Sequence, residues 1–248
     1  MKKIALMALL ALPLAFTSCG DDNKDSVSLD KETLTLKYWD DATLTPSSKG
    51  GQWSSANDFV ATVDNDGKIK ATHVGETTIT YTKDGNSASC KITVEPFYDT
   101  YTLPYLVWNS SIADVKAAVP TNLTIAYEDS EGLSYTTAGN FPVYTYAFEK
   151  NALIAAGMAV DTNDESKFTN FLEQYYKYSF TDEEDLMGEV YCNANSLSNA
   201  TELMVLTFEG TEADIPTATF VPFDATKGSG VNVDAVKAAR KAVNRILK

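Results

Sequence analysis

Residues 52–82 constrain the fold more than any other part of the chain, because short runs of alternating apolar side chains are separated there by turns. Alternation with a period of two is typical of strands that bury one face. Residues 64–67 read Asp-Asn-Asp-Gly, a tight turn in which glycine accepts positive φ, and Gly75 marks a second turn. We therefore expect four short strands in this stretch. The apolar positions are Trp53, Val60, Val63, Ile69, Ala71, Val74, Ile79 and Tyr81.

The same stretch carries a family motif. Its residues are Trp53-Ser54-Ser55-Ala56-Asn57, then Val60-Ala61-Thr62-Val63-Asp64 with Gly67 and Ala71, then Gly75 and Ile79-Thr80. With this pattern, residues 27–96 resemble the group 2 bacterial immunoglobulin-like domain. The resemblance implies a β-sandwich of seven short strands. It also implies a setting among adhesins, other surface proteins and accessory modules of carbohydrate-acting enzymes, but it names no ligand.

The N-terminus predicts a secretory signal peptide over residues 1–18, with two lysines, an apolar run and small residues before Cys19. Residues 16–19 resemble a bacterial lipobox, with Phe16 where leucine is usual. The resemblance implies that Cys19 becomes the first residue and carries palmitate and other acyl chains, which would hold the protein to a membrane. The alternative is an ordinary secretory signal that happens to precede a cysteine.

Residues 19–26 are short, polar and acidic, and predict a tether without a core of its own. An acidic run after the lipidated cysteine also resembles the export signal of Gram-negative lipoproteins displayed on the outer face, although a plain solvated linker has the same composition. We therefore expect a protein that is lipid-anchored in the outer membrane, at the cell surface. The periplasmic face stays open as the alternative.

Beyond Pro96 the pattern changes from strands alone to strands mixed with helices. We expect a multidomain fold in which the all-β immunoglobulin-like sandwich is followed, over residues 97–226, by an α+β domain. This domain should have an antiparallel sheet and two to three helices, packed on one face. The expected helices span residues 111–119 and 163–178, the second with Thr162 and Glu165 as its capping box. The expected strands span residues 123–127, 133–136, 143–148, 152–160, 190–192, 202–208 and 217–223.

Residues 227–248 predict a flexible Gly-Ser linker followed, from residue 231, by a basic amphipathic helix. The apolar residues fall on one stripe, and five basic residues stand against the single acidic Asp234. We expect this helix to dock on the protein's own acidic surface, because the two are oppositely charged and joined by a short linker. The alternative is a helix that lies on anionic lipid.

The candidate ligand-binding residues are Tyr98, Tyr101, Tyr105 and Trp108, which crowd one segment after Pro96. Flat aromatic rings stack on sugar faces and anchor protein partners. The alternative is that these rings fill the seam between the two domains or the core of the second.

Other chemistry has less support. The net charge of −14 argues against a nucleic-acid partner. His73, the only histidine, lies in the first domain, which excludes a Ser-His-Asp triad, a Cys-His pair and a His-built zinc site from the second. We expect no catalytic residue, no metal site and no cofactor. Cys90 and Cys192 should be separate buried thiols, with an interdomain disulfide as the alternative.

The sequence therefore predicts a non-catalytic binding or adhesion module for a glycan or a protein, held to the membrane through the lipid on Cys19. Two alternatives remain open. One is a structural envelope protein with no soluble ligand. The other is a glycoside hydrolase that uses a carboxylate pair from the set Glu128, Glu149, Glu189 and Glu209.

Overall fold

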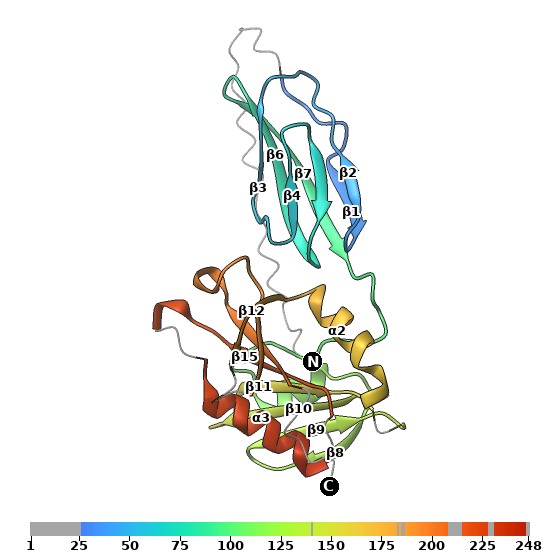
Figure 1. Ribbon diagram of the computed structural model, residues 1–248, viewed down its shortest axis with the longest axis vertical. Helices are drawn as coiled ribbons and strands as arrows, with labels where there is room; N and C mark the ends of the chain where they lie inside the picture. The colour runs from blue at the N-terminus through green and yellow to red at the C-terminus, as the bar shows by residue number, and fades with distance from the viewer. Residues whose placement is uncertain are drawn as a thin grey trace, which may run out of the picture.

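The computed structural model describes residues 26–139, 141–182, 184, 187–207, 215–227 and 231–246 (Figure 1). Residues 1–25 lie outside this description, so the signal peptide, most of the tether and the lipidation of Cys19 remain predictions. Within the described residues the chain forms two parts, each with its own sheets and its own core.

The first part is a β-sandwich whose sheets have the strand orders β1-β7-β6-β3 and β2-β5-β4. Ile69, Ile79 and Ile92 are buried in the core between the sheets. Trp53 is half-buried against this core, with its ring centroid 4.7 Å from that of Tyr81. The predicted sandwich of short strands is confirmed. The strands are β1 (Thr33–Lys37), β2 (Asp41–Thr43), β3 (Gln52–Ser55), β4 (Ala61–Val63), β5 (Lys68–Ala71), β6 (Gly75–Lys83) and β7 (Asn86–Glu95).

The turn between β4 and β5 shows why the motif needs its glycine. Gly67 has a φ of +80°, a conformation that side chains with a Cβ rarely adopt. A Cβ at this position would lie 2.5 Å from the carbonyl oxygen of Leu44 and 2.8 Å from the ring of Trp53. The turn therefore fixes both the hairpin and the packing of the motif tryptophan.

The second part is built on an eight-stranded sheet in the order β12-β13-β14-β15-β11-β10-β9-β8, with antiparallel pairing throughout. Among the described residues three α-helices accompany it, so the predicted α+β character is confirmed. The elements are α1 (Ile112–Ala118), β8 (Thr124–Glu128), β9 (Gly132–Thr136), β10 (Val143–Glu149), β11 (Ala152–Ala159), α2 (Glu165–Glu173), β12 (Lys177–Asp182), β13 (Gly188–Cys192), β14 (Glu202–Thr207), β15 (Thr217–Pro222) and α3 (Val233–Ile246), with short 3-10 helices at Thr162–Asp164, Leu197–Asn199 and Ala225–Lys227.

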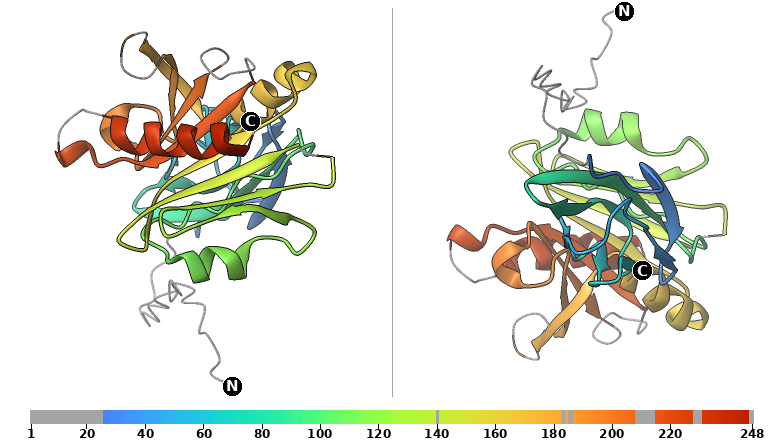
Figure 2. Two further views of the ribbon diagram at one scale, coloured as in Figure 1. Left: turned by 90° about the horizontal axis from the view of Figure 1, so that it is seen from below. Right: turned by 90° about the horizontal axis from the view of Figure 1, so that it is seen from above.

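Helices cover both faces of this sheet, so the prediction that they pack on one face is wrong. On β10, Tyr144 and Tyr146 belong to the core shared with α1 and α2, whereas Ala147 belongs to the core shared with α3. Figure 2 shows α1 in green and α3 in red on opposite sides of the sheet. Because both faces are covered, β10 and β11 are apolar nearly throughout instead of alternating with polar residues.

Helix α3 packs its apolar stripe onto the sheet through Val236, Ala239 and Val243, which confirms that the C-terminal helix docks on its own chain. Beneath the stripe it packs with apolar side chains such as Ala155 and Val221 and not with carboxylates of the described residues, so the expected acidic docking surface is wrong. A Cβ at Gly157 of β11 would lie 2.4 Å from Thr145 Oγ1 and 3.5 Å from Val243 Cγ2. The glycine therefore leaves room for the side chain of Thr145, its partner on the neighbouring strand β10.

The expected helix over residues 163–178 is too long, since α2 ends at Glu173 and the edge strand β12 begins at Lys177. The predicted capping box is also wrong. Thr162 lies in a short 3-10 helix, which is capped by the Asp161 side chain accepting from the backbone N–H of Asn163 at 2.9 Å.

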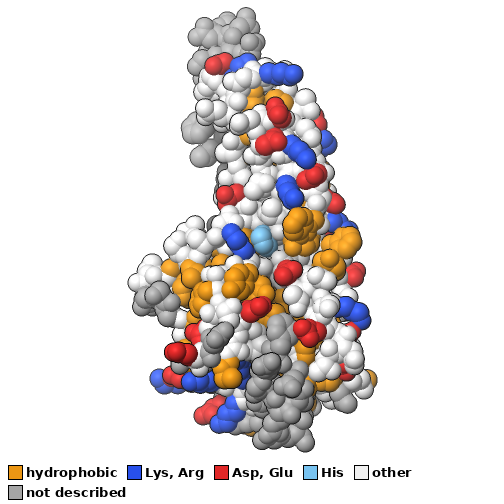
Figure 3. All heavy atoms as spheres, viewed as in Figure 1, with side chains coloured by type: hydrophobic (Ala, Val, Ile, Leu, Met, Phe, Trp, Pro, Cys, Tyr) orange, Lys and Arg blue, Asp and Glu red, His pale blue; other side chains and the backbone are white. Residues whose placement is uncertain are grey.

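The two parts meet where α2 ends. The backbone N–H of Val74 donates to the carbonyl oxygen of Gln174 at 2.8 Å, and Asn195 Nδ2 donates to Asp58 Oδ1 at 2.6 Å. Hydrophobic side chains gather on the surface near this junction (Figure 3). Hydrogen bonds thus join the two parts at this junction.

Candidate functional site

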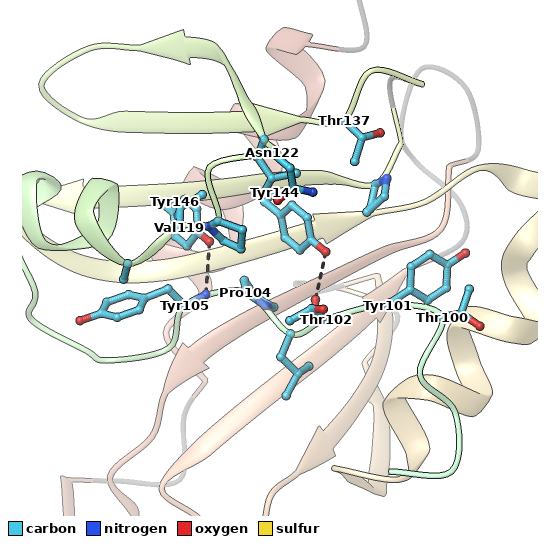
Figure 4. Close-up of a pocket in the computed structure, with 15 residues that line it drawn as sticks. Thr100, Tyr101, Thr102, Pro104, Tyr105, Val119, Asn122, Thr137, Tyr144 and Tyr146 are labelled. Atoms are coloured by element: carbon cyan, nitrogen blue, oxygen red, sulfur yellow. Dashed lines mark hydrogen bonds between the residues drawn. The ribbon is translucent and has the colours of Figure 1, made fainter.

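The segment from residue 97 to 108 carries the predicted aromatic candidates and crosses the α1 face of the sheet; we call it the strap. Two tyrosines of β10 hold it by hydrogen bonds (Figure 4). The hydroxyl of Tyr144 donates to the carbonyl oxygen of Thr102 at 3.1 Å, and the backbone N–H of Tyr105 donates to the hydroxyl of Tyr146 at 3.2 Å. The middle of the strap is therefore fixed to the sheet at two points.

A pocket of about 480 Å³ lies between the strap, the end of α1 and strand β10. This volume falls within the range of small-molecule sites in proteins. None of the described residues that line it carries a charged side chain. The lining residues are Thr100, Tyr101, Thr102, Leu103, Pro104, Tyr105, Ala118, Val119, Pro120, Asn122, Leu123, Thr137, Pro142, Tyr144 and Tyr146.

Two of the four predicted candidates line this pocket. Tyr101 and Tyr105 do, whereas Tyr98 and Trp108 do not. All four are partly buried against the core of the second part, as the alternative interpretation expected. Tyr98 lies at the junction, where the side-chain amide of Gln174 binds its backbone N–H and carbonyl.

Tyr101 is held from behind by α2 and the turn before it. Its ring stands edge-on to Phe168 and Phe171, each with centroids 5.7 Å apart, and its hydroxyl donates to Asp164 Oδ2 at 3.0 Å. Burial and then the Asp164 carboxylate raise the pKa of Tyr101 above its usual range. The ring is therefore neutral and fixed at the edge of the pocket.

The tyrosines of β10 are functional candidates that the sequence analysis missed. Tyr144 and Tyr146 alternate along the strand and so share the face that lines the pocket. Burial raises the pKa of both hydroxyls. The signal was present in the run Val-Tyr-Thr-Tyr-Ala-Phe, but the register that places it under the strap depends on the sheet.

The described carboxylates considered for glycoside hydrolysis do not converge on the pocket. Glu128 on β8 binds Lys116 at 2.8 Å, and Glu189 on β13 accepts from Tyr191 at 2.8 Å. Those two strands lie six positions apart in the sheet, or roughly 29 Å at the usual strand spacing. Glu149 contacts Lys150 at 3.4 Å, and Glu209 lies outside the described residues.

The two described cysteines are free, buried thiols, Cys90 in the sandwich core and Cys192 in the core under α3. The interdomain disulfide is therefore excluded. Among the described residues, no group of three or more His, Cys, Asp or Glu side chains is placed to hold a metal ion. None of the described helices has the length and apolar character needed to cross a membrane.

Comparison with known families addresses the first part of the chain. The family model described as bacterial Ig-like domain (group 2) matches residues 26–94. The sequence resemblance is thereby confirmed for the Ig-like part. No curated protein matches the chain.

Solved structures resemble the chain only distantly. An EHEC O157:H7 intimin mutant is 16% identical over 45% of this chain and 86% of its own, with a TM-score of 0.26. Domains 4–9 of the surface layer protein SbsC are 12% identical over 81% of this chain and 27% of theirs, with a TM-score of 0.25. A SusE-like surface located polysaccharide binding protein from the Bacteroides thetaiotaomicron heparin utilisation locus is 9% identical over 80% of this chain and 33% of its own, with a TM-score of 0.22. Likenesses this weak carry no argument about function.

The single histidine has a structural place in the Ig-like part. The His73 ring stacks on Phe59 with centroids 3.8 Å apart, and its Nδ1 lies 2.7 Å from the Phe59 carbonyl oxygen. Because a carbonyl accepts hydrogen bonds, Nδ1 carries the proton. Burial and, secondarily, the nearby Lys177 of β12 lower the pKa of His73. His73 is therefore a half-buried packing residue at the junction.

Proposed function

We propose that this chain is a non-catalytic binding module of the bacterial cell surface, anchored through a lipid on Cys19, and that the strap pocket binds a glycan. The observation that carries the proposal is the lining of the pocket. Ring faces of fixed tyrosines lie beside the free polar groups of Asn122 and the strap threonines. Sugars have the matching chemistry, with apolar C–H faces and hydroxyl edges.

The path of the chain supports a spacer role for the Ig-like part. Residue 28 bonds to Ser47 at the end of the sandwich far from the second part, and β1 runs from there toward the junction, parallel to β7 (Figure 1). A tether ending at Ser26 therefore enters the sandwich at its far tip. In this proposal the Ig-like part is a spacer that holds the second part away from the membrane.

A concave site favours a glycan over a protein partner. A protein interface of standard size covers about 800 Å² on each partner and is centred on exposed anchors. Tyr101 and Tyr105 are instead half-buried, with their hydroxyls bound to Asp164 and Ser110. They offer ring surface to a small ligand within a preformed pocket.

Binding of oligosaccharides to the purified protein, measured on a glycan array and then by calorimetry, tests the proposal. Tyr101→Ala and Asn122→Ala should each weaken binding by about tenfold or more, since each removes a pocket contact. The matched controls are Tyr178→Ala, an exposed tyrosine on the opposite sheet edge, and Asn170→Ala, an exposed residue of α2. Controls that weaken binding equally, or a wild-type protein that binds no glycan, would contradict the proposal.

A further inference from the structure

We infer that the strap pocket takes an electrically neutral sugar and recognises it without an ion pair. This inference rests on the proposed glycan-binding function and narrows it to one class of ligand. It follows from the neutral hydrogen-bonding groups that line the pocket, and from the net negative charge of the chain, which repels anions.

The free hydrogen-bonding groups of the described lining are all neutral. The side chains of Thr100, Thr102 and Asn122 are exposed at its rim and make no hydrogen bond to any other described residue. Two hydroxyls and one carboxamide can both donate and accept, as sugar hydroxyls do. Binding by such groups does not select for charge on the ligand.

The tyrosine hydroxyls add no charge either. The Tyr144 hydroxyl donates to the carbonyl oxygen of Thr102, so its lone pairs are left to accept a hydrogen bond. The Tyr146 hydroxyl accepts from the N–H of Tyr105, so its proton is left to be donated. Burial raises the pKa of both groups, so they stay neutral at physiological pH. Each hydroxyl can therefore accept or donate one further hydrogen bond, to a ligand that need not be ionised.

The carboxylate that binds the lining residue Tyr101 is already paired with a lysine. Asp164 accepts the hydroxyl proton of Tyr101 on the α2 side of the ring and also pairs with Lys167 at 2.5 Å. Its charge is thus already compensated by a lysine. The described lining therefore offers no cation that could bind a uronate or a sulfate, and no free anion that could bind an amino sugar.

An acidic sugar would meet two costs in this pocket. Its carboxylate would lose hydration without gaining a cationic partner, which is unfavourable for any ion. The chain also carries a net charge of −14, which repels anions at long range. A neutral sugar meets neither cost.

The test compares neutral oligosaccharides with uronic-acid and sulfated ones of equal length, by calorimetry with the purified protein. Neutral ligands should bind at least about tenfold more tightly than acidic ones. Their Kd should change by less than about twofold between roughly 50 and 500 mM NaCl, since no ion pair is available to be screened. Asn122→Lys should add binding of acidic ligands that falls with salt, whereas Asn170→Lys, placed on α2, should not.

The outcomes separate the inference from the function on which it rests. Acidic ligands that bind the wild type as tightly as neutral ones, and lose binding in Tyr101→Ala, would overturn the inference while leaving glycan binding at this pocket intact. Affinity for neutral ligands that falls steeply with salt would overturn it in the same way. No binding of any glycan would overturn the proposed function and the inference together.

Discussion

The side-chain amide of Gln174 makes two hydrogen bonds to the backbone of Tyr98. Its Oε1 accepts from the Tyr98 N–H at 3.1 Å, and its Nε2 donates to the Tyr98 carbonyl oxygen at 2.6 Å. Oε1 also accepts from the N–H of Phe97 at 3.0 Å, and the Gln174 carbonyl accepts from Val74. One buried residue at the end of α2 therefore joins the start of the strap to the Ig-like part.

Loss of the Gln174 amide should destabilise the protein. Gln174→Ala leaves two backbone N–H groups and one carbonyl without their partner, and each unsatisfied buried group costs about 1–3 kcal/mol. We expect the free energy of unfolding to fall by about 2–4 kcal/mol, measured by urea denaturation. Asn170→Ala, one turn earlier on the exposed side of α2, should change it by less than about 0.5 kcal/mol. Equal effects of the two variants would contradict this role for the amide.

The hydroxyl of Tyr146 should control how firmly the strap is held. Tyr146→Phe keeps the ring but removes the acceptor for the Tyr105 N–H, so amide exchange at Tyr105 should become about tenfold faster. Tyr191→Phe is the matched control, because its hydroxyl binds Glu189 on the same strand, β13, which does not neighbour β10 in the sheet. Unchanged exchange at Tyr105 would mean that the strap does not depend on this bond.

The sequence allowed the elements of local origin to be predicted and missed those set by the sheet. The Ig-like motif and the short helix α1 follow from neighbours in the chain, and the structure has both. The run around Tyr175 and Tyr178 was predicted as helix from its aromatic spacing. That spacing does not show that residues 177–182 pair with β13 as an edge strand, which is what the structure has. The strap tyrosines were chosen for their clustering. Tyr144 and Tyr146, which complete the pocket from a strand distant in sequence, could not be placed without the register.

The proposed lipidation of Cys19 predicts where the protein is found in the cell. The wild type should sediment with the outer-membrane fraction and incorporate labelled palmitate, because acyl chains on Cys19 contribute about 0.8 kcal/mol per buried methylene. Cys19→Ser should release the protein into the soluble fraction. Cys90→Ser is the control, since that thiol is buried in the sandwich core. Membrane association that survives Cys19→Ser, without label in the wild type, would rule out the anchor.

His73 predicts a loss of stability as the pH falls. Its pKa in the folded protein lies below the ordinary value of 6.5, so between the two values the unfolded chain binds more protons than the folded one. Stability contributed by the neutral imidazole is complete above pH 6.5 and is lost as the pH falls through the folded pKa. Urea unfolding from pH 7.5 to 5 should show this fall, and His73→Gln should remove it. A slope that persists in His73→Gln would assign it to other groups.

Glu202 predicts the opposite dependence on pH. The side chain is only 8% exposed, its Oε1 accepts the hydroxyl of Tyr176, and the Trp108 side chain also hydrogen-bonds to it. Burial raises the pKa of Glu202 above the ordinary value of 4.5, so above that value the folded protein retains a proton that the unfolded chain has released. The stability that this proton contributes is complete below pH 4.5 and is lost as the pH rises through the folded pKa.

Glu202→Gln isolates the effect, because it keeps an acceptor oxygen for Tyr176 and removes the ionisable proton. We expect the variant to be more stable than the wild type at pH 8, and its unfolding free energy to lose the decline with rising pH. Glu149→Gln, at an exposed site, is the matched control and should follow the wild-type curve. Urea unfolding across pH 5–8 in the His73→Gln background separates this slope from the histidine's opposite one. A Glu202→Gln protein that is less stable than its parent at pH 8 would mean that the ionised carboxylate, bound by Tyr176 and Trp108, stabilises the core.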